Sequence, residues 1–143
     1  MNRRVGTLEV SSRKVVLLVE DDTAIRVLLR KALQRLGLKV FEASNGRGAI
    51  NFLTNNKPDL VCLDLVLPEL SGFEILTFIR RNRSFDALPV LVVSARPLPE
   101  DQAQAREQGA SAYLTKPFTP GEFEHCVRSL LAANSDPGPA RTA

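Results

Sequence analysis

Five short apolar runs, each separated from the next by a helical pattern, limit the folds open to this chain. The runs at residues 15–19, 60–63 and 90–93 are continuous and rich in β-branched residues, which is typical of strands buried on both faces of a parallel sheet. The runs at 38–41 and 112–114 are alternating or short, so we expect them at the sheet edges. Strands and helices that alternate over about 120 residues predict an α/β fold: a single doubly wound, five-stranded parallel sheet with helices on both faces.

The segments between these runs carry helical signals. The last helix has the clearest start, with Thr119 as N-cap, Pro120 at the first helical position and Glu122 three residues after the cap. The first helix is predicted to end near Gly37 and to turn its apolar residues inward, since they follow the spacing of one helix face: Ile25, Leu28, Leu29, Ala32, Leu33 and Leu36.

The fourth helical segment, which begins at Pro99, is unusually polar. Its only apolar residues are Ala103 and Ala105, so the helix buries little area and little holds it against the sheet. We expect it to be the most mobile helix of the domain.

Composition places the chain among soluble globular proteins of one domain. The 143 residues are 44% hydrophobic and 24% charged. No apolar run reaches the roughly 18 to 20 residues that a membrane helix requires, so we expect a cytoplasmic protein with no membrane partner. The net charge of +3 is scattered and no segment resembles a recognition helix, so we expect no direct binding of nucleic acid. Cys62 and Cys126 lack metal-ligand spacing and are interpreted as structural.

Polar residues stand where the predicted strands end. Glu20 and Asp21 follow the first strand, Asp64 the third, Ser94 the fourth and Lys116 the fifth. Parallel strands bring their carboxyl ends to one edge of the sheet, where ligands bind. Three carboxylates crowded there repel one another unless a cation lies among them, and carboxylate oxygens suit Mg²⁺.

A lysine and a hydroxyl beside such a metal supply a positive charge and a hydrogen-bond donor for a phosphoryl group. Phosphoryl transfer depends mostly on positioning and on neutralising charge, so the set fits that chemistry. Asp64, alone at the end of the central strand, is the natural acceptor of the group. Asp22, by contrast, is expected to face outward and to serve the start of the first helix.

Four motifs in this order resemble the receiver domain of bacterial two-component response regulators: VVLLVEDD, then DLVLPELSG from Asp64 to Gly72, then VVSA from Val92 to Ala95, then YLTKPF from Tyr113 to Phe118. The resemblance covers about residues 14–131. It implies a flavodoxin-like sheet with strand order 2-1-3-4-5. We divide the chain into a basic N-terminal extension (1–13), a receiver domain (14–132) and a flexible Pro/Gly-rich tail (133–143).

The resemblance also implies roles at the metal and phosphoryl site. Asp64 corresponds to the phosphoacceptor and also to a metal ligand, taking its phosphoryl group from the phosphohistidine of a histidine kinase or a histidine phosphotransfer protein. Asp21 corresponds to the direct Mg²⁺ ligand, and Glu20 to a second acid that acts through a metal-bound water. The backbone carbonyl of Val66 would complete the metal site.

Further roles concern the switch that responds to phosphorylation. Ser94 corresponds to the hydroxyl that reaches toward the phosphoryl oxygens, Lys116 to their cationic partner and Tyr113 to the aromatic residue that rotates. Pro117 matches an unusual turn, often a cis peptide bond, which would aim Lys116 inward. The face made by the fourth helix, fifth strand and fifth helix would then bind a downstream protein target.

The function expected from this resemblance is that of a stand-alone phosphoacceptor, not an enzyme beyond phosphorylation and slow dephosphorylation of its own aspartate. One alternative is a receiver fragment of a larger regulator whose output domain is missing. Another, from a different class, is a Mg²⁺-dependent phosphatase with an aspartyl nucleophile. Such enzymes place a second acid two residues after the nucleophile, where this chain has Val66.

Two residues and one loop depart from the pattern of the family, and one helix face is basic. Val66 and Arg96 stand where some fast-cycling receivers carry polar or acidic residues, and we therefore expect slow loss of phosphate. Two prolines in the loop 96–99 restrict the backbone, so rearrangement there is expected to be hinge-like. Basic residues line the outer side of the first helix, either as a solvated face or as a docking site for an acidic partner: Arg26, Arg30, Lys31 and Arg35.

Overall fold

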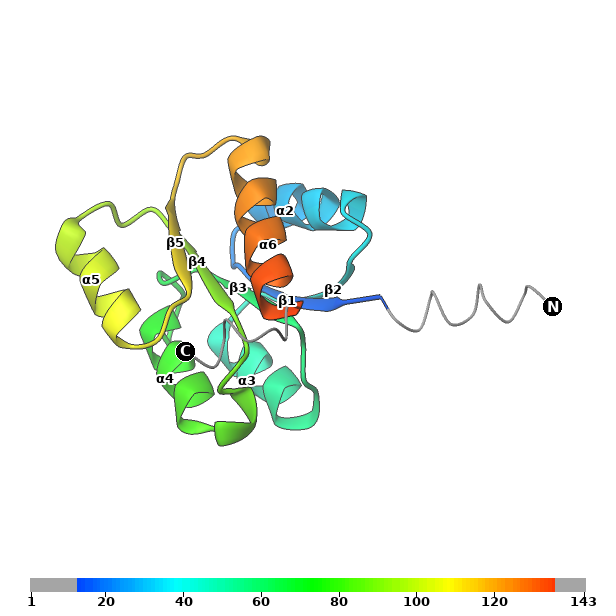
Figure 1. Cartoon of the computed structure of the whole chain (residues 1–143). Coiled ribbons are helices and arrows are strands. Elements are labelled where there is room, and N and C mark those ends of the chain that lie inside the picture. Colours follow the sequence, from blue (N-terminus) through cyan, green and yellow to red (C-terminus); the bar gives the residue numbers. More distant parts are fainter. Residues whose placement is uncertain (1–12, 136–143) are drawn as a thin grey trace.

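One parallel sheet organises the computed structural model, which describes residues 13–135 (Figure 1). Its strand order is β2-β1-β3-β4-β5, which confirms the predicted doubly wound, flavodoxin-like topology. The two runs expected at the edges, β2 and β5, lie there. The strands are β1 (Val15–Val19), β2 (Lys39–Ala43), β3 (Leu60–Leu63), β4 (Val90–Ser94) and β5 (Ala112–Thr115).

Helices cover both faces of the sheet (Figure 1). They are α2 (Thr23–Arg35), α3 (Gly46–Asn55), α4 (Gly72–Arg81), the short 3₁₀ helix η1 (Arg83–Phe85), α5 (Pro99–Glu107) and α6 (Pro120–Ser135). Side chains of β1 alternate between two cores: Leu17 and Val19 pack with α3, α4 and α5, whereas Val16 and Leu18 pack with α2 and α6. This alternation of period two explains why a central strand must be apolar throughout.

Local capping explains where several helices begin and end. Asn45 caps α3 by accepting a hydrogen bond from the Gly48 amide at 2.8 Å. Thr119 and Glu122 exchange hydrogen bonds of 2.8 and 3.1 Å at the start of α6, as predicted. Gly37 adopts φ +83° just after α2, which only glycine does readily.

Three details differ from the sequence-based expectations. Leu28 was predicted to face inward but is 52% exposed, because it lies at the margin of the apolar stripe of α2, whose buried residues are Leu29, Ala32 and Leu33. Helix α6 continues to Ser135, beyond Leu131, the last apolar residue of its predicted face. Asp101, a charged residue, is buried in α5 beside Ala105.

The two predicted ends of the chain fall largely outside the described residues. Only Arg13 of the basic extension 1–13 and residues 133–135 of the tail 133–143 belong to the described part. Within residues 13–135, no helix combines the length and the hydropathy that crossing a membrane requires.

Candidate functional site

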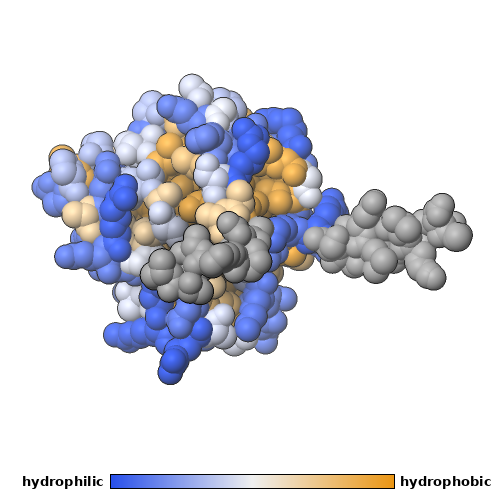
Figure 2. All heavy atoms as spheres, viewed as in Figure 1, coloured by the Kyte–Doolittle hydropathy of each residue, from blue (hydrophilic) through white to orange (hydrophobic). Residues whose placement is uncertain are grey.

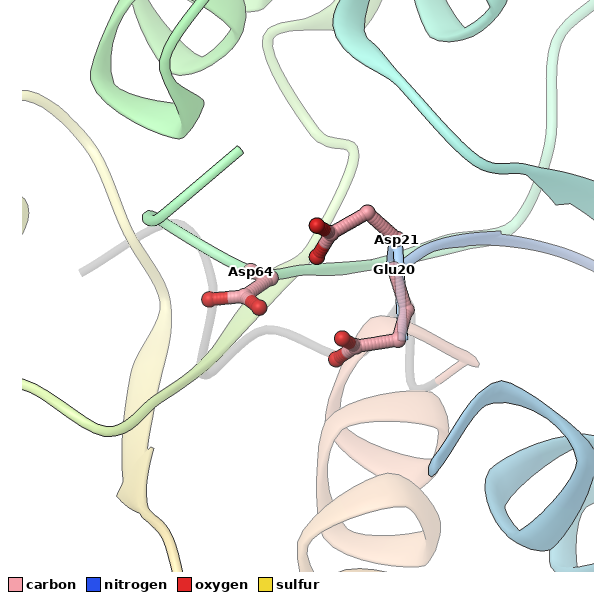
Figure 3. A group of neighbouring side chains, drawn as sticks. All are labelled: Glu20, Asp21 and Asp64. Carbon is pink, nitrogen blue, oxygen red and sulfur yellow. The ribbon is translucent and has the colours of Figure 1, made fainter. Parts of the chain in front are cut away.

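The carboxyl edge of the sheet brings three acidic side chains together (Figure 3). Val19 of β1 is in register with Leu63 of β3, so the residues that follow them, Glu20 and Asp64, lie level with each other. Each of Glu20, Asp21 and Asp64 offers a carboxylate oxygen, and these oxygens lie within 4.8 Å of one another. Glu20 and Asp64 are buried, at 1% and 4% exposure, whereas Asp21 is exposed. The structure therefore assembles the three carboxylates that the strand ends predicted.

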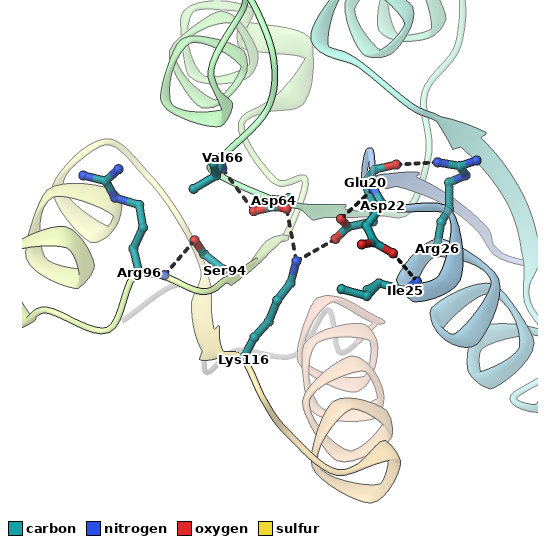
Figure 4. A network of polar contacts seen from close by, with 9 residues as sticks. All are labelled: Glu20, Asp22, Ile25, Arg26, Asp64, Val66, Ser94, Arg96 and Lys116. Atoms are coloured by element: carbon teal, nitrogen blue, oxygen red, sulfur yellow. Dashed lines mark hydrogen bonds and ion pairs between the residues drawn. The ribbon is translucent and has the colours of Figure 1, made fainter.

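Lys116 joins two of these carboxylates (Figure 4). Its Nζ donates to Glu20 Oε1 at 2.9 Å and to Asp64 Oδ2 at 3.1 Å. The Lys116 amide also donates to the Ser94 carbonyl at 2.8 Å, which fixes its backbone one residue beyond β5. The peptide bond from Lys116 to Pro117 is cis, as the resemblance implied.

Electrostatics at the site reflect this crowding. Burial raises the pKa of the Glu20 carboxyl, and the nearby Asp64 charge raises it further, against the opposing effect of Lys116. Burial acts to lower the pKa of Lys116, but the carboxylates of Glu20 and Asp64 outweigh it, so this pKa lies above its usual value. Lys116 is thus held as a cation between two acids.

The cluster fits a divalent cation by charge and by donor type. Three carboxylates carry three negative charges and Lys116 contributes one positive charge, which leaves two negative charges in a mostly buried site. All donors are oxygen atoms on short side chains, the ligands that Mg²⁺ prefers. Glu20, Asp21 and Asp64 are the side chains that would hold the ion.

Neighbouring backbone contacts position these acids. Asp22 Oδ1 accepts from the Ile25 amide at 3.0 Å, so Asp22 caps α2 and lies outside the cluster, as expected. Its own amide donates to Glu20 Oε2 at 3.1 Å. The Val66 amide donates to Asp64 Oδ1 at 3.0 Å, and the Val66 side chain is 52% exposed beside the site. The metal-ligand role of the Val66 carbonyl stays a prediction.

Gly72, the last residue of the DLVLPELSG motif, allows a close backbone approach to the site. A Cβ atom at this position would lie 2.3 Å from the Asp64 carbonyl oxygen and 2.6 Å from the Leu65 Cα. The Gly72 amide donates to the Leu65 carbonyl at 3.0 Å. The first turn of α4 therefore rests directly on the backbone that carries Asp64.

Three of the four basic residues on the outer side of α2 form ion pairs with acids of this chain. Arg26 donates from Nε to Glu42 at 3.0 Å and from Nη1 to the Glu20 carbonyl at 2.8 Å. Arg30 pairs with the other oxygen of Glu42 at 3.1 Å, and Arg35 pairs with Glu124 at 3.1 Å. Most of the predicted basic face is thus occupied by partners on β2 and α6.

The two predicted switch residues meet at Arg96. Ser94 is fully buried, and its Oγ accepts from the Arg96 amide at 3.2 Å. The Tyr113 hydroxyl donates to the Arg96 carbonyl at 2.7 Å, and burial raises the pKa of this hydroxyl. The Arg96 guanidinium in turn pairs with Asp101 of α5 at 3.1 Å. Sequence reasoning noted Arg96 only as a departure and missed Asp101, since a lone acid in a polar helix gives no signal of burial.

Comparisons with known proteins agree with this geometry. The family model of the response regulator receiver domain matches residues 16–128. The chain is 44% identical over 120 residues to the KDP operon transcriptional regulatory protein KdpE of Escherichia coli (strain K12), covering 84% of this chain and 52% of KdpE. It is 35% identical over 127 residues to the alkaline phosphatase synthesis transcriptional regulatory protein PhoP of Bacillus subtilis (strain 168), covering 89% of this chain and 52% of PhoP.

The chain thus spans about half the length of these curated relatives. Among solved structures, it resembles the chemotaxis response regulator CheY4 of Vibrio cholerae, with a TM-score of 0.79, 28% identity, and coverage of 84% of this chain and all of that one. The motifs, the sheet order and the matched family lead to the same conclusion, which is that this chain belongs to the response regulator receiver domains of two-component signalling systems.

Proposed function

We propose that Asp64 accepts a phosphoryl group from the phosphohistidine of a histidine kinase or a histidine phosphotransfer protein. The observation that carries this proposal is the position of Asp64, buried at the sheet edge with one oxygen on Lys116 and two further carboxylates beside it. A carboxylate held in this way can act as a nucleophile. The two neighbouring carboxylates can bind a divalent cation beside it.

The proposed transfer uses groups already in place. One Asp64 oxygen forms a bond to phosphorus while the phosphorus–nitrogen bond of the phosphohistidine breaks, and the imidazole leaves with its electron pair. Lys116 neutralises phosphoryl oxygens, since its Nζ lies 3.1 Å from Asp64 Oδ2. Mg²⁺, held by Glu20, Asp21, Asp64 and the Val66 carbonyl, would supply the remaining positive charge. Release of phosphate is expected to be slow, because Val66 offers no polar group to position water.

The proposed output is a change at the face made by α5, β5 and α6. Ser94 turns toward the phosphoryl oxygens, Tyr113 rotates inward, and the altered face binds a downstream protein. This face is chemically mixed: hydrophilic side chains cover α5, and apolar surface gathers between α5 and α6 (Figure 2). We place this activity in the cytoplasm, where histidine kinases present their phosphohistidine.

The relatives also support a second arrangement, in which the receiver controls an attached output domain. KdpE and PhoP are transcriptional regulatory proteins about half of whose length this chain matches. In that case phosphorylation of Asp64 would be unchanged and only the recipient of the signal would differ. The phosphatase alternative is disfavoured, because an exposed Val66 side chain occupies the position of the required second acid.

The test is incorporation of phosphate from acetyl phosphate, followed by intact mass. Wild type with Mg²⁺ should gain one phosphoryl group, and the Asp64→Asn variant should gain none. Asp86→Asn is the matched control, because Asp86 is an exposed aspartate beyond the 3₁₀ helix η1 and should leave incorporation unchanged. Equal incorporation by wild type and Asp64→Asn would refute the proposal.

A further inference from the structure

Arg26 of α2 reaches the end of β1 and contacts the backbone between two acids of the cluster (Figure 4). Its Nη1 donates to the Glu20 carbonyl at 2.8 Å, and this carbonyl belongs to the peptide unit that joins Glu20 to Asp21. The Glu20 amide donates to the Ala43 carbonyl of β2 at 3.1 Å, so the backbone of Glu20 is held at both its amide and its carbonyl. The Arg26 contact therefore fixes the plane of the peptide from which Asp21 extends.

The Arg26 guanidinium is itself held by an acid of β2. Its Nε donates to Glu42 Oε1 at 3.0 Å, and Arg30 donates to Glu42 Oε2 at 3.1 Å. The Arg26 side chain is 18% exposed, whereas the side chains of Glu42 and Arg30 are 30% exposed. The two contacts of Arg26 use the planar fork of one guanidinium, with Nε on the carboxylate and Nη1 on the carbonyl. A lysine ammonium cannot reproduce this arrangement.

Asp21 depends on its backbone more than the other two acids do. Glu20 and Asp64 each accept hydrogen bonds from Lys116 and from a backbone amide. The Asp21 side chain is exposed, and in the described part of the chain no hydrogen bond or ion pair holds its carboxylate. The main chain on which this carboxylate stands is held by Arg26, which thereby limits where the carboxylate can lie.

We propose that Arg26 is a positioning residue for the cation site. It holds the main chain of Asp21 beside the other two acids, and Glu42 orients its guanidinium. The inference rests on the proposed function, because that function assigns a divalent cation to the three acids. Among the described residues, Arg26 bonds no carboxylate of the cluster and acts through the Glu20 carbonyl. Outer contacts of this kind typically contribute about 10- to 100-fold to metal affinity.

The charge of Arg26 and its position make opposite predictions for Mg²⁺ binding. A guanidinium near a cation site repels the ion, so loss of its charge alone would tighten binding. Loss of its hold on the peptide between Glu20 and Asp21 would weaken binding, because one of the three carboxylates would no longer be kept in place. We expect calorimetric titration to show Mg²⁺ binding by Arg26→Met that is roughly tenfold weaker than binding by wild type.

Arg26→Lys keeps the positive charge and loses the fork, so it should also weaken Mg²⁺ binding, by at least about threefold. The matched control is Arg30→Met on the same helix, which removes an arginine from the same Glu42 carboxylate but no contact with Glu20. It should change Mg²⁺ affinity by less than about twofold. Binding by Arg26→Met equal to or tighter than that of wild type, or equal weakening by Arg30→Met, would overturn the inference.

A second measurement needs no metal and separates this inference from the proposed function. The Asp22 amide donates to Glu20 Oε2, so its hydrogen exchange in the metal-free chain, followed by NMR, reports on the loop that carries Asp21. Exchange should be at least about threefold faster in Arg26→Met and Arg26→Lys than in wild type. The Gly72 amide, which donates to a carbonyl outside this loop, should be unchanged.

Unchanged exchange at Asp22 in both variants would refute the positioning role, even if Mg²⁺ binding weakened. Accelerated exchange at Asp22, together with a wild-type chain that binds no Mg²⁺, would count against the cation site of the proposed function and not against the hold of Arg26 on this loop. Urea unfolding of each variant shows that the titrated protein is folded, and Arg26→Lys carries both measurements if Arg26→Met does not fold.

Discussion

Among the individual residues of the site, one cation lies between two buried acids. Lys116 Nζ contacts both Glu20 and Asp64, and each of these acids also accepts a backbone amide hydrogen bond, from Asp22 and Val66 respectively. The two carboxylates are therefore oriented by the chain itself. Lys116 supplies the positive charge that both carboxylates share.

Replacement of Lys116 should separate metal binding from phosphoryl transfer. Lys116→Met removes the competing positive charge, so we expect Mg²⁺ to bind about tenfold more tightly, which is roughly 1.4 kcal/mol. Phosphoryl incorporation should fall by at least about tenfold, because phosphoryl oxygens lose their cationic partner. Calorimetric titration with Mg²⁺ and intact mass after acetyl phosphate measure the two effects.

The control for this variant is Lys31→Met on the exposed side of α2, which should change neither quantity. Weaker Mg²⁺ binding by Lys116→Met would contradict the view that the lysine and the metal compete for the same carboxylates. Normal phosphorylation of Lys116→Met would show that the lysine has no part in the transfer.

Among the contacts between elements, the close approach of α4 to the backbone of Asp64 predicts that Gly72 tolerates no side chain. Gly72→Ala places a Cβ 2.3 Å from the Asp64 carbonyl oxygen, so the helix and the site backbone must separate. We expect a loss of roughly 2 to 4 kcal/mol in the free energy of unfolding, as for overpacking against rigid backbone. Urea unfolding measures the loss.

Gly48→Ala in α3 is the matched control. Its Cβ would meet nothing closer than 3.4 Å, at the Asn45 Oδ1 atom, so the change should be neutral or stabilising by up to about 1 kcal/mol. If both variants lose stability equally, the loss reflects glycine replacement in general and not the approach of α4 to Asp64.

Arg80 at the end of α4 joins three segments in a similar way. Its guanidinium donates to the carbonyls of Phe85, Leu88 and Gly109 at 2.8, 2.7 and 3.0 Å, and burial lowers its pKa. Arg80→Lys should lower the free energy of unfolding by roughly 2 kcal/mol, because a single ammonium cannot reach three carbonyls in the geometry of a planar guanidinium.

Chemical denaturation measures the free energy of unfolding of Arg80→Lys and of the control Arg81→Lys. Arg81 is the exposed neighbour on the same helix. The Arg81 variant should unfold within about 0.5 kcal/mol of wild type. If Arg80→Lys lost equally little free energy of unfolding, the three hydrogen bonds of Arg80 would add no stability beyond that of its positive charge.

Across the whole molecule, the patterns in the sequence suffice to predict the fold and the place where the strand ends meet. Continuous apolar strands identify the sheet interior, and parallel strands must align their carboxyl ends, so Glu20, Asp64 and Lys116 converge once the topology is known. These are consequences of local periodicity and of one topological rule, which is why they could be predicted.

Contacts between distant polar side chains could not be predicted in this way. Arg80 bonds a carbonyl 29 residues away, and Arg26 pairs with an acid 16 residues away, with no spacing rule to link them. The burial of Asp101 depends on where the β4–α5 loop places Arg96. The exposure of Leu28 depends on how far α2 rotates toward the sheet, which the helix pattern alone leaves open.

Phosphorylation of Asp64 is best tested by locating the phosphoryl group itself. After reaction with acetyl phosphate and Mg²⁺, borohydride reduction converts an aspartyl phosphate to homoserine, and peptide mass spectrometry then identifies the residue. We expect homoserine at position 64 and unmodified Asp59 in the same region of the chain. Homoserine at Asp21 or Asp59, or at no aspartate of a chain that has gained phosphate, would rule out Asp64 as the phosphoacceptor.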